Sequence, residues 1–187
     1  MADQLRADAR SNRDQILAAA QIVFREQGVD VPMKEIADQA GVGVGTLYRR
    51  FPDRGALISA AAQAYMQALA DLAATAAREE DGAWQALRRF LRECAELRLG
   101  ATAAAIEPAL HADIRADPNL TDIRASVAEQ VARLTAQAQV DGELRTDVDA
   151  QDMARLMTVQ IYARPDESYE QAVRRTMDIV LDGLRAR

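Results

Sequence analysis

The side chains best suited to chemistry lie in one short run, residues 43–50, which reads GVGTLYRR. Leu47 and Phe51 are spaced i and i+4, so a helix over residues 44–50 would bury both of them and leave hydroxyl and guanidinium groups on its outer faces. Gly43 and Gly45 have no side chains and would let backbone N–H groups approach a phosphate. This arrangement suits a groove of DNA. The alternative is that the glycines only form a turn and that Tyr48 packs on its neighbours.

Groups for catalysis or metal binding are few. His111 and Cys94 are the only histidine and cysteine, so the spacing supports no Ser-His-Asp or Cys-His pair, no internal disulfide and no multi-cysteine metal site. The carboxylates are scattered over predicted helix surfaces. The glycine-rich run 41–45 follows a predicted helix and lacks the lysine and the serine or threonine of a nucleotide-binding loop. We therefore expect no enzyme activity, no cofactor and no metal.

The run 43–50 forms the second half of a predicted helix-turn-helix. In residues 33–40, Ile36, Ala37 and Ala40 fall on one helical face. Gly41, just past that stretch, is a stop signal, and a second short helix follows. Two helices of about two turns cannot bury a core alone. We expect the apolar face of a preceding helix, ending at Gly28, to complete a three-helix head.

These motifs resemble the signature of the tetracycline-repressor (TetR) family of bacterial transcription regulators, over roughly residues 10 to 60. The resemblance implies a helix-turn-helix DNA-binding domain at 1–54, with its recognition helix at about 44–50. It also implies a helical ligand-binding and dimerisation domain at 55–187, in an all-α protein of about nine helices. The residues that carry it are Ile36-Ala37, Ala40-Gly41-Val42, Gly45-Thr46-Leu47-Tyr48, Phe51-Pro52 and Arg54.

The resemblance also implies which residues contact DNA. Thr46, Tyr48 and Arg54 fall where family members contact phosphates, and the other outer residues of 44–50 lie where bases and neighbouring phosphates are met. Arg49 is the first candidate for a bidentate pair with guanine, which contributes about 1 to 3 kcal/mol of discrimination. The expected DNA-binding residues are Lys34, Gly43, Val44, Gly45, Thr46, Tyr48, Arg49, Arg50 and Arg54.

Two positions depart from the family's pattern. Pro32 stands where a threonine is common; it suits the first turn of a helix but has no hydroxyl to donate to a phosphate. Gly43 stands where a serine is frequent, so the second helix lacks a side-chain cap, at a cost of about a few tenths of a kcal/mol.

The remainder of the chain is predicted to be helical as well. The 187 residues are 49% apolar and 28% charged, with many alanines and almost no β-branched runs, which is the composition of a globular all-α protein. A long helix starting near Asp53 is expected to connect the head with the second domain. Asp149 and Ser168 can cap the last two helices.

Those last two helices, one extending from Asp149 through Ile161 and the other from Ser168, are expected to form the dimer interface as a four-helix bundle with their symmetry mates. The alternative is that their apolar stripes are buried within one subunit. The expected interface residues are Met153, Leu156, Met157, Ile161, Val173, Met177, Val180 and Leu181.

A ligand pocket is expected among the helices of the second domain, where Glu107 and His111 would give it a polar end. The alternative is that the same apolar stripes are ordinary core and that His111 is partly exposed. The expected pocket residues are Met66, Leu69, Trp84, Leu87, Phe90, Cys94, Leu97, Ile106, Leu110, His111, Val127, Val131, Met157 and Tyr162.

Charge and hydropathy agree with a regulator that acts in the cytoplasm. No apolar run reaches the ~18 to 20 residues of a membrane span, so we expect no membrane contact. The net charge is −6, and the acidic excess lies in residues 59–187 while residues 1–58 are close to neutral. The leading hypothesis is a homodimeric, ligand-responsive repressor that a small molecule of unknown identity releases from a palindromic operator. The alternatives are an activator or co-repressor-dependent regulator, and a helical sequestering protein or enzyme whose head does not bind an operator.

Overall fold

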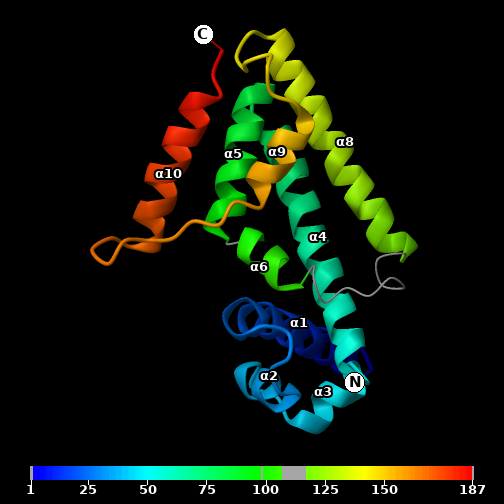
Figure 1. Cartoon of the computed structure of the whole chain (residues 1–187). Helices are drawn as coiled ribbons and strands as arrows, with labels where there is room; N and C mark the ends of the chain where they lie inside the picture. Colours follow the sequence, from blue (N-terminus) through cyan, green and yellow to red (C-terminus); the bar gives the residue numbers. More distant parts are fainter. Residues whose placement is uncertain (1, 98, 107–116, 187) are drawn as a thin grey trace. The chain divides into compact units, whose positions relative to one another are not determined.

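The computed structural model describes residues 2–97, 99–106 and 117–186 (Figure 1). Over these ranges the protein is helical and has no strand, apart from an isolated antiparallel bridge between Leu144 and Arg185. The predicted all-α class is therefore confirmed. Two compact units divide the chain: a head unit, Met1–Tyr65 with Thr102–Asp117, and a body unit, Met66–Ala101 with Pro118–Arg187. Within the described ranges no helix is long and apolar enough to cross a membrane.

The head unit is built on α1 (Ala2–Gln27), α2 (Met33–Gln39), α3 (Val44–Arg50) and the start of α4 (Arg54–Glu79). Each helix contributes fully buried side chains to one core, because apolar residues recur on the helix face that turns inward. The largest are Ile16, Phe24, Ile36, Leu47 and Leu57. The short helix α2 packs on α1, and α3 packs on α2, so both are held by tertiary packing in the three-helix head that the sequence predicts.

The turn between α2 and α3 is fixed by a backbone motif at Gly41. Its φ of 66° lies in the left-handed region that glycine adopts without strain. The Gly41 N–H donates to the Asp38 carbonyl at 3.1 Å, and the Val42 N–H donates to the Ala37 carbonyl at 3.0 Å. These two bonds form a Schellman motif, which satisfies the last carbonyls of α2. The predicted stop signal is confirmed.

Arg54, the first residue of α4, ties that helix to the loop between α1 and α2. Its guanidinium Nη1 donates to the Val31 carbonyl at 2.6 Å and to the Val29 carbonyl. Two carbonyls without helical partners are thereby satisfied by a charged donor, which is a strong form of hydrogen bond. The side chain is half-buried, so it acts as a structural anchor of the head unit.

The body unit is organised around α5 (Ala83–Glu96), which packs against α8 (Pro118–Val140), α9 (Ala150–Met157) and α10 (Tyr169–Gly183). Figure 1 shows α5 between α10 and α8. Its fully buried side chains, Leu87, Phe90, Leu91 and Cys94, form the centre of this second core. The shorter helix α6 spans Leu99–Ile106.

Asp149 and Ser168 cap the last two helices, as predicted, and each cap is part of a capping box. The Asp149 carboxylate accepts hydrogen bonds from the backbone N–H groups of Gln151 and Asp152, and the Ser168 hydroxyl accepts one from Gln171. The extension of the first of these helices through Ile161 is wrong, because α9 ends at Met157. Its last turn closes where the Thr158 N–H and hydroxyl donate to the Arg155 carbonyl.

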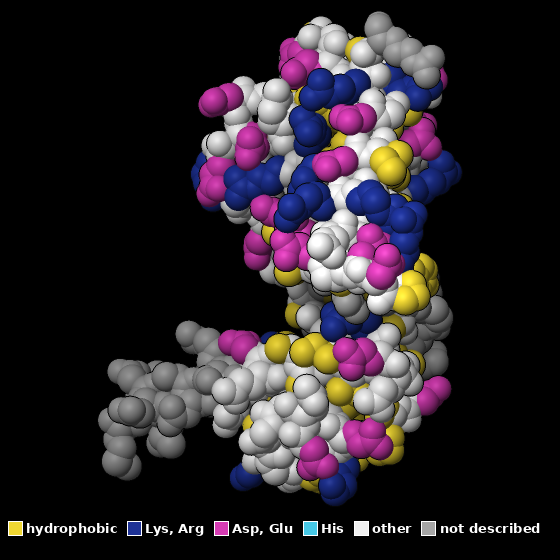
Figure 2. Space-filling view, turned by 90° about the vertical axis from the view of Figure 1, so that its left-hand side faces the viewer, with side chains coloured by type: hydrophobic (Ala, Val, Ile, Leu, Met, Phe, Trp, Pro, Cys, Tyr) yellow, Lys and Arg dark blue, Asp and Glu magenta, His cyan; other side chains and the backbone are white. Residues whose placement is uncertain are grey.

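Ion pairs join the helices of the body unit. The Arg89 guanidinium lies 2.9 Å from both Glu79 and Glu93 and 3.2 Å from Glu80, so it links α5 with the end of α4. Arg92 on α5 pairs with Asp178 on α10 at 2.7 Å. The face that α10 contributes shows Arg side chains lying among Asp and Glu (Figure 2). This mixed pattern leaves that face without a large field of one sign.

Burial makes the Cys94 thiol unreactive. Loss of solvation, with a further contribution from the neighbouring Glu93 charge, raises the pKa of Cys94 to about 12. At about pH 8 the thiolate is therefore a minute fraction of the folded protein, whereas an unfolded cysteine has a pKa of about 8.5.

We expect a disulfide reagent such as Ellman's reagent to leave the native protein unmodified and to titrate the thiol of Cys94 after denaturation. Prompt reaction of the native protein would contradict this assignment.

Replacing Arg54 should weaken the head unit. Arg54→Met keeps the length of the side chain but leaves the Val29 and Val31 carbonyls without their donor, so we expect a loss of about 1 to 3 kcal/mol in the free energy of unfolding. Denaturant unfolding followed by circular dichroism measures the loss. Arg50→Met, an exposed change nearby, should have almost no effect; equal stabilities of the two variants would show that Arg54 anchors nothing.

Candidate nucleic-acid interface

The outer face of α3 is open to solvent along its length. Leu47 and the following Phe51 are buried in the head unit, whereas Val44 and Tyr48 are 36% and 47% exposed. Gly45 and the two arginines at 49 and 50 are exposed as well. The buried pair Leu47 and Phe51 therefore fixes the position of the helix on one side, and the opposite side presents polar and cationic groups to solvent. This is the arrangement that the i, i+4 spacing predicts.

Packing within the protein does not require glycine at Gly43, which caps α3, or at Gly45, which lies within it. A Cβ atom built on Gly43 or Gly45 would meet nothing within 4 Å. Gly43, at the start of the helix, has φ −68° and ψ 142°, a conformation open to any residue, and supplies no side-chain cap. The absent side chains leave space only toward solvent. Another surface can therefore approach this backbone closely.

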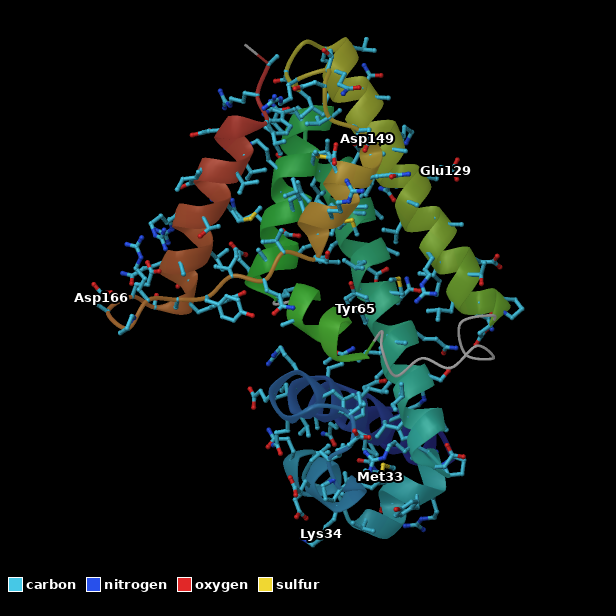
Figure 3. The ribbon with its side chains drawn as sticks, in the orientation of Figure 1. Met33, Lys34, Tyr65, Glu129, Asp149 and Asp166 are labelled. Atoms are coloured by element: carbon cyan, nitrogen blue, oxygen red, sulfur yellow. The ribbon has the colours of Figure 1, made fainter. Side chains whose placement is uncertain are left out.

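Two cations near α3, Arg49 and Lys34, make local bonds on the protein surface. Arg49 folds back along its own helix, where Nε donates to the Gly45 carbonyl at 3.1 Å and Nη2 donates to Thr46 Oγ1 at 3.2 Å. Lys34 pairs with Asp38 at 2.6 Å, and this hydrogen bond raises the pKa of Lys34. These exposed bonds are weak and are readily exchanged for others. Figure 3 shows Lys34 reaching outward from the head unit while the adjacent Met33 lies inside it.

One residue of the expected set, Arg54, bonds within the protein. Arg54 donates to the loop between α1 and α2 and is half-buried, so its guanidinium is engaged by the protein itself. Pro32 precedes α2 with no side-chain cap, as its chemistry requires. Arg13 of α1 was not in the expected set; its guanidinium carbon lies 5.5 Å from the centre of the Phe51 ring, at the end of α3. Helix periodicity could not have indicated this cross-helix contact.

A separate cavity of about 400 Å³ lies in the body unit between α4, α8 and α9. Five of the residues expected in a pocket line it: Met66, Leu69, Val127, Val131 and Met157. The lining residues that the sequence analysis missed are mostly alanines. Small side chains at helical spacing are the signal that could have indicated them. They are Arg124, Ala128, Ala132, Ala150, Gln151 and Ala154.

The other expected pocket residues lie elsewhere. Trp84, Leu87, Phe90 and Cys94 are buried in the core around α5, and they do not line the cavity because their helix face packs directly on its neighbours. Ile106 is buried but belongs to the head unit. Leu97 and Tyr162 are 54% and 79% exposed, since each follows the end of a helix. Leu110 and His111, together with Glu107, fall outside the described residues.

The residues expected at a dimer interface divide into two groups. Met153, Val173, Met177 and Leu181 are buried within the chain, and Met157 lines the cavity. Their stripe faces α5, which is the alternative that periodicity left open. Leu156, Ile161 and Val180 are half-buried. Ile179, which was not expected, is 66% exposed on α10.

Comparison with known proteins covers both units. The profile described as bacterial regulatory proteins of the tetR family matches residues 16–61. The profile described as the SbtR-like transcriptional regulator C-terminal domain matches residues 82–186. An HTH-type transcriptional regulator of Staphylococcus aureus (strain USA300) is 44% identical over 54 residues, which is 28% of this chain; the chain spans only 29% of the length of that relative.

Solved structures extend the similarity to nearly the whole chain. A TetR transcription regulatory protein from Mycobacterium vanbaalenii is 32% identical, covers 97% of this chain and 99% of its own, and has a TM-score of 0.71. A TetR transcriptional regulator from Streptomyces coelicolor is 35% identical over 93% of this chain and 98% of its own, with a TM-score of 0.66. With an exposed second helix in its helix-turn-helix head and a matching C-terminal domain, this chain belongs to the TetR family of transcriptional regulators.

Proposed function

We propose that this protein is a homodimeric repressor that binds a palindromic operator in the cytoplasm and is released from it by a small molecule. The observation that carries the proposal is the outer face of α3, where exposed Tyr48, Arg49 and Arg50 flank a backbone left open at Gly43 and Gly45. A helix that presents hydroxyl and guanidinium groups around a backbone open to close approach is suited to act as a recognition helix in a major groove.

Arg49 has the reach and the chemistry for base recognition. It lies in the last turn of α3, is exposed, and donates hydrogen bonds to Gly45 and Thr46 of its own helix. Exchanging those bonds for the O6 and N7 atoms of a guanine replaces one pair of acceptors with another. Thr46 and Tyr48 are then left to donate to phosphates, which position the helix without reading sequence.

Dimerisation supplies the second recognition helix. In a two-fold dimer the two α3 helices enter successive major grooves about 34 Å apart, and the operator mirrors the symmetry of the protein. Exposed Ile179 and half-buried Leu156 and Val180 supply apolar surface on the last two helices, and half-buried Ile161 follows the end of α9. An isologous contact through these helices would bury that surface.

Release by a small molecule follows from a two-state equilibrium. A ligand that binds better to the state unable to hold DNA shifts the population toward it. Reaching 99% release from 1% requires a preference of about 5.5 kcal/mol for that state. The mainly apolar lining of the cavity between α4, α8 and α9 supports binding of such a ligand there. The same cavity favours a second candidate, a sequestering protein that binds small molecules without an operator.

Gly45→Ala separates a binding role from a folding role. An added methyl group meets no atom of the chain and replaces a helix-disfavouring glycine, so we expect the free energy of unfolding to stay the same or to rise by up to about 1 kcal/mol. We expect affinity for DNA selected by the protein from a random library to fall at least about tenfold, because the methyl group occupies the space of close approach. Fluorescence anisotropy measures the affinity. Unchanged binding by a stable variant would mean that no surface approaches there.

Arg49→Ala tests base reading directly. We expect its affinity for the selected sequence to fall by about 1 to 3 kcal/mol, and its discrimination at one base pair to relax. The matched control is Arg133→Ala, which removes an exposed arginine from α8. A sequestering protein would give the same result for both variants, namely no change, and that outcome would refute the repressor.

A further inference from the structure

We propose that the cavity between α4, α8 and α9 takes an uncharged small molecule, with an elongated apolar body and one polar group, such as a hydroxyl or a carbonyl, beside Gln151. The inference deepens the proposed function and rests on it in one respect, since it names the chemical class of the effector. The binding itself depends on residues of the body unit alone.

The size and shape of the cavity suit an elongated molecule. Its volume of about 400 Å³ lies within the ~300 to 1,000 Å³ of ligand sites in proteins. The α8 residues in its lining extend from Arg124 to Ala132, a stretch of about 12 Å at ~1.5 Å per residue. Buried Leu69, Val127 and Val131 form its interior. An extended apolar body can therefore lie along α8.

The lining requires that body to be apolar. Nine of the eleven lining residues are apolar, and only Arg124 and Gln151 carry polar side chains. A ligand with many hydroxyl groups would bury most of them without partners, at a cost for each. An apolar body loses no hydrogen bonds on entering and gains from removal of its surface from water. The site therefore selects against sugars and other highly hydroxylated molecules.

The charged groups around the cavity leave no free counter-ion for a ligand within the described lining. Arg124, the charged residue of the lining, already has an interaction within the protein. On α9, the Asp152 carboxylate caps its own helix and pairs with Arg155. On α8, Glu129 is exposed and reaches away from α9 (Figure 3). A ligand charge of either sign would thus lose hydration among apolar side chains without gaining a partner, so the cavity favours an uncharged molecule.

Gln151 gives the cavity one polar position. Its backbone N–H donates to the Asp149 carboxylate at 2.8 Å, whereas its side chain is exposed and ends in an amide, which both donates and accepts hydrogen bonds. Because α8 and α9 run in opposite directions (Figure 1), Gln151, in the first turn of α9, lies toward the Ala132 end of the cavity. A hydroxyl or carbonyl at one end of the ligand can therefore form a hydrogen bond with this amide.

Three probes with the same alkyl chain test the charge of the ligand: octanol, octanoate and octylammonium. Their binding to the full-length protein is measured by displacement of the neutral fluorescent probe N-phenylnaphthylamine. We expect octanol to bind at least about tenfold more tightly than either ion. In the series hexanol, heptanol and octanol, we expect the Kd to fall about fourfold for each added methylene group, because each is buried in the apolar lining.

Two pairs of variants locate the binding. Gln151→Leu should raise the Kd of octanol about fivefold, whereas Gln137→Leu, an exposed change on α8 outside the lining, should not alter it. Ala154→Leu fills the edge of the cavity and should abolish binding of the fluorescent probe while circular dichroism shows an unchanged fold. Its matched control, Ala136→Leu, lies on α8 outside the lining and should bind the probe normally.

The inference is overturned if octanoate or octylammonium binds the wild-type protein as tightly as octanol, or if the alcohols do not displace the probe. Binding by Ala154→Leu that equals binding by Ala136→Leu would place the ligand elsewhere. An Ala154→Leu variant that still binds the probe but no longer dimerises would show that a second copy occupies the cavity, and would overturn the inference as well.

The two proposals fail separately, because probe binding is measured without DNA. A protein that shows this pattern of affinities but selects no DNA sequence refutes the repressor and leaves the ligand class standing. A protein that selects an operator but lacks the pattern refutes the ligand class alone.

Discussion

The burial of Leu47 and Phe51 is the constraint on which the proposed recognition surface depends. The helix α3 has seven residues, and a helix of about two turns has no stability of its own in water. Removing an aliphatic or aromatic side chain of this size from water contributes roughly 1.5 to 3 kcal/mol. Since both side chains lie on one face, their packing in the head unit sets the rotation of α3. That rotation determines which residues reach outward.

The surroundings of α3 limit its freedom further. The Schellman motif at Gly41 fixes the path of the chain into the helix, and Arg54 ties the start of α4 to the loop before α2. The side-chain positions of the proposed recognition face contribute little to the fold: a Cβ atom added at Gly43 or Gly45 would meet no atom, and Arg49 donates hydrogen bonds within its own helix. A surface that the fold does not need is free to be shaped by what it binds. The same reasoning applies in the body unit, where small side chains surround a cavity that core packing would otherwise close.

The sequence predicted what depends on neighbours along the chain. The helix-turn-helix, the stop at Gly41 and the caps at Asp149 and Ser168 are local features, and all are confirmed. Helical periodicity shows which face of a helix is apolar but not what covers it. For that reason it could not tell that Met153 and Val173 face their own subunit or that Trp84 lies in the core beside the cavity. It also could not place Arg54, whose carbonyl partners lie more than twenty residues earlier in the chain.

The central claim is that two α3 surfaces read DNA as a symmetric pair. Selection of duplex DNA from a random library with the purified protein tests it most directly. The account predicts enrichment of a two-fold symmetric sequence whose half-sites are centred about 10 base pairs, or a multiple of that distance, apart and are bound by two subunits. Failure to enrich any sequence, or enrichment of a single asymmetric site bound by one subunit, would contradict it.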